Sequence, residues 1–64
     1  MSPEEMAALH ARVFTSHPAA WSAAAFSGLL AEPSVFALEG AGAFLLARVV
    51  ADEAELLTLA VAPE

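Results

Sequence analysis

The sequence predicts an α+β fold in which two N-terminal helices precede a three-stranded antiparallel meander. Apolar residues recur at helical spacing in the part of the 64-residue chain before Pro33. After Pro33 the periodicity changes, and apolar runs of strand length follow one another. Two turn-forming segments, Gly40-Ala41-Gly42 and Asp52-Glu53, separate these runs where hairpin connections would lie.

The first helix is predicted over residues 3–15. Ser2 can cap it, Pro3 suits the first helical position, and Glu5 stands where a capping box requires an acidic residue. The helix is expected to end before Pro18, because the residue preceding a proline avoids helical geometry. Its apolar stripe consists of Met6, Leu9, Val13 and Phe14.

The second helix is predicted over residues 22–31, with Ser22 as its N-cap. Glu32-Pro33 ends it, and Gly28 weakens it by about 1 kcal/mol relative to alanine. Both helices are short, so they need packing against the rest of the fold to persist. The apolar stripe of the second helix consists of Phe26, Leu29 and Leu30.

Strands are predicted over residues 34–39, 43–51 and 54–61. Asp-Glu is not a favoured pair in two-residue hairpins, so a longer turn is an alternative at Asp52-Glu53. Strict alternation divides the last strand into two faces, neither of which is polar enough to face water. We therefore expect this strand to lie in the middle of a sheet. One face consists of Glu55, Leu57, Leu59 and Val61, and the other of Leu56, Thr58 and Ala60.

The composition indicates that this chain needs a partner to cover its apolar residues. Its apolar fraction is 59%, whereas about 45–50% is typical of soluble domains even with glycine included. A chain of this length buries only about 60% of its extended surface, so its interior is small. The chain ends soon after Val61, before any neighbour for its last strand. We therefore expect a second copy, another partner or, preferably, the other half of a larger fold.

Several classes of function are disfavoured by the composition. The chain has no cysteine, so it has no disulfide or thiolate site. Its net charge is −6, and its two arginines, Arg12 and Arg48, do not form the basic cluster that nucleic acid requires. The uncharged stretch 13–31 contains few strongly apolar residues, so we expect no membrane span. The acidic N-terminus argues against a targeting peptide, and we expect a cytoplasmic protein.

The two histidines are not expected to bind a metal ion. His10 and His17 lack a third ligand at a suitable spacing. His10 is instead expected to pack beside Phe14, one helical turn away. Arg48 is expected to pair with an acidic residue across the hairpin, a contact of little energetic weight at the surface.

The residue pattern over 43–63 resembles the central hairpin of the GNAT N-acetyltransferases, and is most similar to the ribosomal-protein-alanine type (RimI type). The segments that carry the resemblance are Asp52-Glu53-Ala54-Glu55-Leu56 and Leu59-Ala60-Val61-Ala62-Pro63. Upstream, Leu9-His10-Ala11-Arg12-Val13-Phe14 and Trp21-Ser22-Ala23-Ala24-Ala25-Phe26 resemble the first two helices of that family. The resemblance covers essentially the whole chain but only the N-terminal half of the family's domain.

This resemblance implies an enzyme that transfers acetyl from acetyl-coenzyme A directly to an amine, in particular a protein N-terminal amine. The family's diphosphate-binding loop, Arg/Gln-x-x-Gly-x-Gly/Ala, follows its Val-x-Pro, and its later Asn and Tyr follow in turn. None of these is found after Val61-Ala62-Pro63, and the family's opening strand is also missing. We therefore expect this chain alone to be inactive and to need the C-terminal half of the domain or a second copy.

The resemblance also assigns candidate site residues. Leu59, Ala60 and Val61 are expected to bind acetyl-coenzyme A through backbone groups. Glu55 is the candidate general base, because a carboxylate desolvated among apolar neighbours is a better proton acceptor. The RimI-type enzymes, however, take their glutamate from further downstream, and an exposed strand-end charge is the alternative for Glu55. Trp21 and Ser22 are expected to line the acceptor groove, with a core anchor as the alternative for Trp21.

A non-enzymatic function is the alternative for the whole chain. In that case the chain would be a small α+β interaction protein that dimerises through the exposed edge of its last strand. No metal ion, nucleic acid or membrane is expected as a partner in either case.

Overall fold

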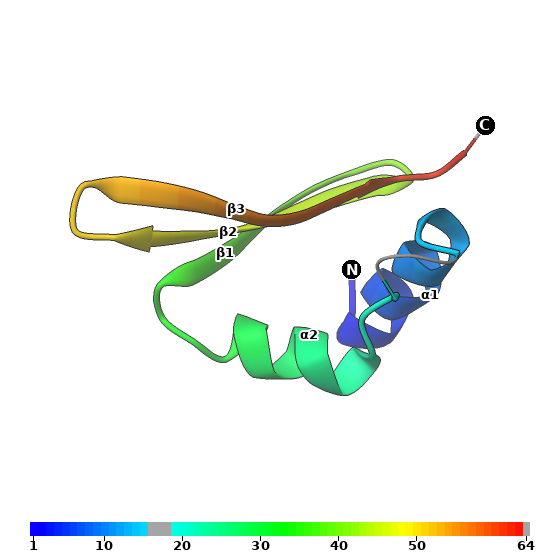
Figure 1. The fold of residues 1–64 in the computed structure, drawn as a ribbon, viewed down its shortest axis with the longest axis horizontal. Coiled ribbons are helices and arrows are strands. Elements are labelled where there is room, and N and C mark those ends of the chain that lie inside the picture. Colours follow the sequence, from blue (N-terminus) through cyan, green and yellow to red (C-terminus); the bar gives the residue numbers. More distant parts are fainter. Residues whose placement is uncertain (16–18, 64) are drawn as a thin grey trace.

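The computed structural model describes residues 1–15 and 19–63, and it shows two helices packed on one face of a three-stranded sheet (Figure 1). The strand order β1-β2-β3 and the antiparallel pairing of both neighbours confirm the predicted α+β meander. The elements are α1 (Pro3–Val13), α2 (Ala23–Leu30), β1 (Val35–Gly40), β2 (Ala43–Val50) and β3 (Glu53–Val61).

The start of α1 is fixed by the predicted capping box. The backbone N–H of Ser2 donates to Glu5 Oε1 at 2.8 Å, and the N–H of Glu5 donates to Ser2 Oγ at 3.1 Å. The hydrogen bond from the Ser2 N–H stabilises the charged carboxylate and lowers the pKa of Glu5. The terminal ammonium of Met1 pairs with the Glu39 carboxylate, which ties this end of α1 to β1. The helix ends at Val13, two residues earlier than predicted, with Phe14 as its C-cap.

The start of α2 is set by Ser22, as predicted. Its hydroxyl oxygen accepts a hydrogen bond from the backbone N–H of Ala25 at 3.2 Å. The helix ends at Leu30, and the following turn is closed by a hydrogen bond from the N–H of Glu32 to the carbonyl of Leu29 at 3.0 Å. The two helices thus begin with the side-chain caps that the sequence predicts.

The two hairpins both have two-residue connections. Residues 41–42 join β1 to β2, and the positive φ of Gly42, 69°, is a conformation that glycine adopts readily. Ala51 and Asp52 join β2 to β3, because Val50 pairs directly with Glu53. The longer turn considered for this hairpin is therefore wrong. Ala51 carries a φ of 56°, which is unfavourable for a residue with a Cβ atom.

The core lies between the helices and the facing side of the sheet. Phe26 of α2 is fully buried and meets Phe44 of β2 edge to face, with ring centroids 5.5 Å apart. Full burial of an apolar side chain contributes about 1.5–3 kcal/mol, so a few such residues account for much of the stability of a small domain. The buried apolar cluster comprises Met6, Leu9, Phe26, Val35, Phe44, Leu46 and Ala60.

A β-bulge interrupts β3 and changes which residues share a face. Leu46 pairs with Thr58, whereas the next residue, Ala47, pairs with Leu56, so Leu57 is the extra residue. Side chains alternate between the two faces of the sheet on both sides of Leu57, but the alternation before Leu57 is shifted by one residue relative to the alternation after it. The two faces predicted from strict alternation are therefore wrong. Cross-strand partners place Glu55 on the helix-facing side with Thr58 and Ala60, and Leu56 on the opposite side with Leu59 and Val61.

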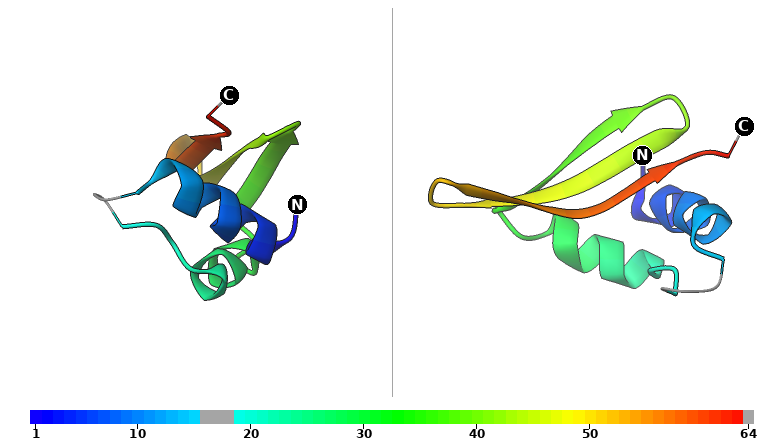
Figure 2. Two further views of the ribbon diagram at one scale, coloured as in Figure 1. Left: turned by 90° about the vertical axis from the view of Figure 1, so that its right-hand side faces the viewer. Right: turned by 45° about the horizontal axis from the view of Figure 1, so that its top comes forward.

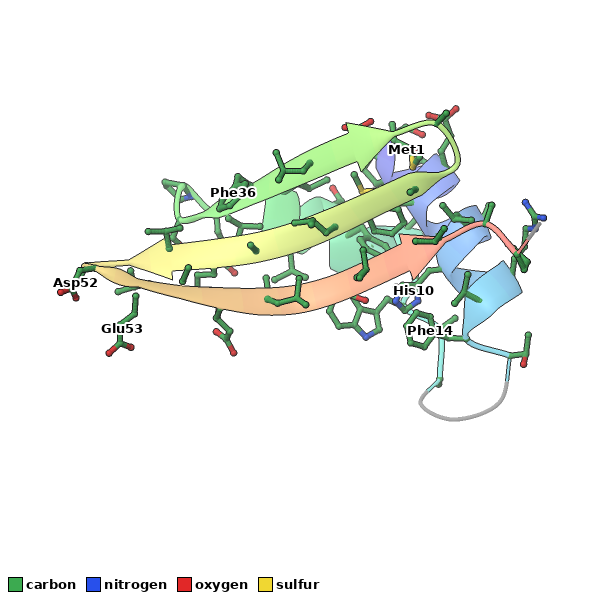
Figure 3. The ribbon with its side chains drawn as sticks, turned by 90° about the horizontal axis from the view of Figure 1, so that it is seen from above. Met1, His10, Phe14, Phe36, Asp52 and Glu53 are labelled. Atoms are coloured by element: carbon green, nitrogen blue, oxygen red, sulfur yellow. The ribbon has the colours of Figure 1, made fainter. Side chains whose placement is uncertain are left out.

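No described element covers the side of the sheet opposite the helices (Figures 1 and 2). Its large side chains are apolar. We call this side the outer face, and Phe36 marks it in Figure 3. Among the described residues β3 is an edge strand of the sheet, so the second neighbour that its apolar faces predict is not found there. The large apolar side chains of the outer face are Phe36, Leu38, Leu45, Val49, Leu56, Leu59 and Val61.

Candidate functional site

The free edge of β3 offers backbone groups that no described strand pairs. The N–H of Ala62 donates to the carbonyl of Gly42 at 2.7 Å, so residue 62 points its backbone groups at the preceding strands. In an antiparallel ladder, alternate residues point toward and away from the partner strand. Leu59 and Val61 therefore point their N–H and C=O groups to the free edge. Ala60 directs its backbone toward β2, so the expectation that its backbone groups are free to bind acetyl-coenzyme A is wrong.

Beneath this part of β3 lies a buried histidine with both ring nitrogens engaged. His10 of α1 is 1% exposed, and its Nε2 lies 3.0 Å from Thr58 Oγ1. Its Nδ1 accepts a hydrogen bond from the backbone N–H of Trp21 at 3.0 Å. Burial lowers the pKa of His10, because the imidazolium would lose its hydration in this environment.

Aromatic rings surround His10 on the remaining sides. The expected packing of His10 beside Phe14 is confirmed: the rings stack with centroids 4.1 Å apart (Figure 3). Trp21 stacks at 5.3 Å, and Phe26 meets the imidazole edge-on at 5.3 Å. His17, the other histidine, lies outside the described residues.

Trp21 is partly buried and packs against the core cluster, as the core-anchor alternative expects. Its indole also meets Phe26, with centroids 5.5 Å apart. Ser22 is exposed and holds the N-cap of α2. Trp21 is thus linked to β3 through His10. Ser22 follows Trp21 in the chain, and its side-chain hydrogen bond among the described residues is to Ala25 of α2.

Glu55 does not have the surroundings that a buried base would need. Its side chain is 66% exposed, and it faces Arg48, its cross-strand neighbour, at 3.5 Å. Arg48 also lies 3.6 Å from Glu32, so the expected ion pair across the hairpin is confirmed and extended. The expectation that Glu55 shares an apolar face with Leu59 and Val61 is wrong, because the bulge intervenes.

Acetyl-coenzyme A, the expected ligand, would need partners for its pantetheine arm and for its phosphates. The outward N–H and C=O groups of Leu59 and Val61 match what amide and thioester groups require. The diphosphate would need cations or a glycine-rich helix start. Arg48 is engaged by two carboxylates, and Arg12 lies on an exposed position of α1. Residues 1–15 and 19–63 therefore contain no cluster of cations for the phosphates.

Other kinds of site find no support in the part of the chain that the structure describes. No group of three or more His, Cys, Asp or Glu side chains could hold a metal ion there. None of its helices is long and apolar enough to cross a membrane.

Thr58 is the site residue that sequence analysis missed. The only available signal was a hydroxyl-bearing residue within an otherwise apolar strand. Its partner could not be identified, because His10 is 48 residues away in the chain.

Comparison with protein-family models found no match, and comparisons with curated proteins and with solved structures found no significant match. The GNAT resemblance therefore stays a prediction from the residues themselves.

Proposed function

We propose that this chain is the N-terminal half of a cytoplasmic GNAT-type N-acetyltransferase that uses acetyl-coenzyme A to acetylate an amine, in particular a protein N-terminal amine. The observation that carries the proposal is the edge of β3 after its bulge. There, Leu59 and Val61 direct unpaired backbone groups outward, next to the apolar outer face. This arrangement suits a strand-like pantetheine arm, which would hydrogen-bond as an added strand does.

We assign each residue a role in donor or acceptor binding from its position in the fold. The backbone of Leu59 and Val61 holds the donor, and Ala60 maintains the ladder to β2. Trp21 and Ser22 precede and begin α2, and they line the acceptor side. The phosphates and the general acid belong to residues that follow this half, so this chain alone binds the donor weakly and does not catalyse transfer. The missing C-terminal half or a second copy completes the site.

The experiment is an NMR titration of the labelled chain with acetyl-coenzyme A. The amide signals of Leu59 and Val61 should shift, and those of Asp52 and Glu53, at the far hairpin tip in Figure 3, should not. Val61→Pro removes an outward N–H at an edge position, where proline is tolerated, and should abolish the shift at Leu59. Val61→Ala keeps the N–H and serves as the matched control. Absence of any shift at millimolar ligand would contradict the proposal.

The general-base role that the resemblance gives Glu55 lacks a buried environment here, and it is tested in the complete protein. Glu55→Gln should reduce turnover and leave acetyl-coenzyme A affinity nearly unchanged, because the amide cannot accept the acceptor's proton. The matched control is Glu53→Gln, which alters a neighbouring exposed carboxylate on β3. Equal turnover in Glu55→Gln and the wild type excludes this role, in keeping with the exposed ion pair to Arg48.

A second candidate function is favoured by the same edge. An unpaired strand beside an apolar face is suited to pairing with another copy of itself. A small interaction protein that dimerises through β3 would show protected Leu59 and Val61 amides in the absence of any ligand. The reading frame after Glu64 separates the two functions, since Arg-x-x-Gly-x-Gly/Ala within about ten residues favours the enzyme.

A further inference from the structure

We propose that His10 is a positioning residue that ties the acceptor-side residue Trp21 to β3 through one fixed imidazole tautomer. The assignment of Trp21 to the acceptor groove and of β3 to donor binding rests on the proposed function. The link itself rests on two hydrogen bonds and on the burial of the ring between them.

The tautomer follows from the donor at one end of the link. A backbone N–H can only donate, so the Nδ1 of His10 must be the unprotonated nitrogen that accepts from Trp21. The proton of the neutral ring then resides on Nε2, which donates to the hydroxyl oxygen of Thr58. A ring in the other tautomer would direct a proton at the Trp21 N–H and lose that bond.

The bridge spans elements that are far apart in the sequence. His10 belongs to α1, Trp21 precedes α2, and Thr58 lies in β3, one residue after the bulge and one before Leu59. Stacking on Phe14 and Trp21 restricts rotation of the imidazole ring. If one hydrogen bond is lost, the ring therefore cannot turn to form another. Loss of the Thr58 hydroxyl should therefore weaken the hydrogen bond between the backbone N–H of Trp21 and His10.

The remaining contacts of His10 supply no competing charge. Phe14 faces it from α1, Trp21 from the loop, Phe26 from α2 and Thr58 from β3, and none of these carries a charge. A buried neutral ring with both nitrogens satisfied is more than a packing residue, because phenylalanine would fill the space and leave the Trp21 N–H without this acceptor.

The test uses the 64-residue chain without ligand and reads the ring directly. Long-range proton–nitrogen NMR should show Nδ1 of His10 unprotonated and Nε2 protonated at pH 7.5. Thr58→Val keeps the shape of the side chain and removes the hydroxyl. It should accelerate hydrogen exchange at the Trp21 amide about three- to tenfold, the effect of weakening one hydrogen bond. Thr58→Ser retains the hydroxyl and should restore slow exchange.

Three results would overturn the link: a ring protonated on Nδ1, unchanged Trp21 exchange in Thr58→Val, or equal acceleration of Trp21 and of the core amide of Leu46. The last result would mean a general loss of stability rather than a connection through His10. An acetyl-coenzyme A titration of the same samples tests the proposed function separately. Failure to bind would reject the acetyltransferase and leave the ring and exchange measurements to decide the link.

Discussion

At the scale of single residues, His10 explains how a polar side chain occupies the centre of an aromatic cluster. Its two ring nitrogens would be costly to bury alone, but each has a partner at 3.0 Å. These two hydrogen bonds require the neutral form of the imidazole, because its Nδ1 must accept a hydrogen bond from the Trp21 N–H group. The imidazolium would lose its hydration and would turn a second donor toward the Trp21 N–H.

His10 should make the stability of the chain depend on pH. Its folded-state pKa is lowered from the ordinary value of 6.5, so the unfolded state binds a proton more readily. The stabilising contribution is thus fully present above pH 6.5 and is lost as the pH falls through the folded-state pKa. We expect the urea midpoint to decrease between pH 7.5 and 5.5.

A substitution isolates the contribution of His10 to this dependence. His10→Gln does not titrate in this range, so its urea midpoint should vary less with pH than that of the wild type, whatever its absolute stability. The pH range lies above the ordinary pKa of glutamate, 4.5, which limits interference from carboxylates such as Glu5. Parallel pH profiles for the two proteins would show that His10 is not responsible.

At the scale of elements, the ends of the helices and the turns are determined by local contacts. Ser2 and Ser22 cap the two helices through their hydroxyls. The two-residue hairpin between β2 and β3 instead forms although its backbone conformation is unfavourable for alanine. It holds Ala51 at a positive φ because Val50 and Glu53 are paired on either side of it.

The hairpin should therefore gain stability from glycine. Ala51→Gly removes the Cβ atom from a left-handed conformation, and the greater freedom of the unfolded chain offsets part of the gain. We expect the free energy of unfolding to increase by about 0.5–1 kcal/mol, measured by chemical denaturation. Ala54→Gly, at an exposed position in β3, is the matched control and should destabilise. A loss of stability in Ala51→Gly would contradict the strained turn.

Ser22 offers a way to separate capping from acceptor binding. Ser22→Ala should lower the free energy of unfolding by about 1 kcal/mol, because Ala25 loses its hydrogen-bond acceptor. Ser22→Asp should retain the cap and the stability. If Ser22 lines the acceptor groove, Ser22→Asp in the complete enzyme should raise KM for the amine without affecting folding. Wild-type KM in this variant would leave Ser22 with a capping role alone.

At the scale of the whole molecule, the sheet has one covered face and one bare face. Both helices lie on the same side of the sheet (Figure 2). The outer face has no charged residue among the described positions. Leu38 is 57% exposed and Leu59 is 48% exposed. Antiparallel sheets that face water on one side normally alternate apolar and polar residues, and this sheet does not. Large apolar patches of this kind mark surfaces of association.

The isolated chain should therefore associate in solution. Sedimentation velocity should show a weight-average mass that rises with concentration, and thermal melting should depend on concentration in the same way. Leu38→Lys combined with Leu59→Lys places two charges on the outer face and should shift the chain toward monomer. Ala8→Lys, on the exposed side of α1, should leave association unchanged. A sharp, concentration-independent melt of a dispersed wild-type monomer would refute this expectation.

The sequence by itself determined the order of the elements, the helix caps and the first turn, whereas the second turn lies at Ala51-Asp52, one residue before the predicted Asp52-Glu53. Ser2, Ser22 and the change of periodicity after Pro33 act within a few residues, so their effects can be read locally. The hydrophobic pattern also indicated that β3 is too apolar to stand at the edge of a sheet without a partner. The acetyl-coenzyme A assignment depends on resemblance, and no contact in the structure decides it.

Only the tertiary structure decided which residues meet. The bulge at Leu57 moved Glu55 away from the face of Leu59, because register depends on cross-strand pairing that strict alternation cannot foresee. The link from Trp21 through His10 to Thr58 joins residues from three parts of the chain. Such contacts arise when α1, α2 and β3 pack together, and the physical reason is the need of a buried imidazole to satisfy both of its nitrogens.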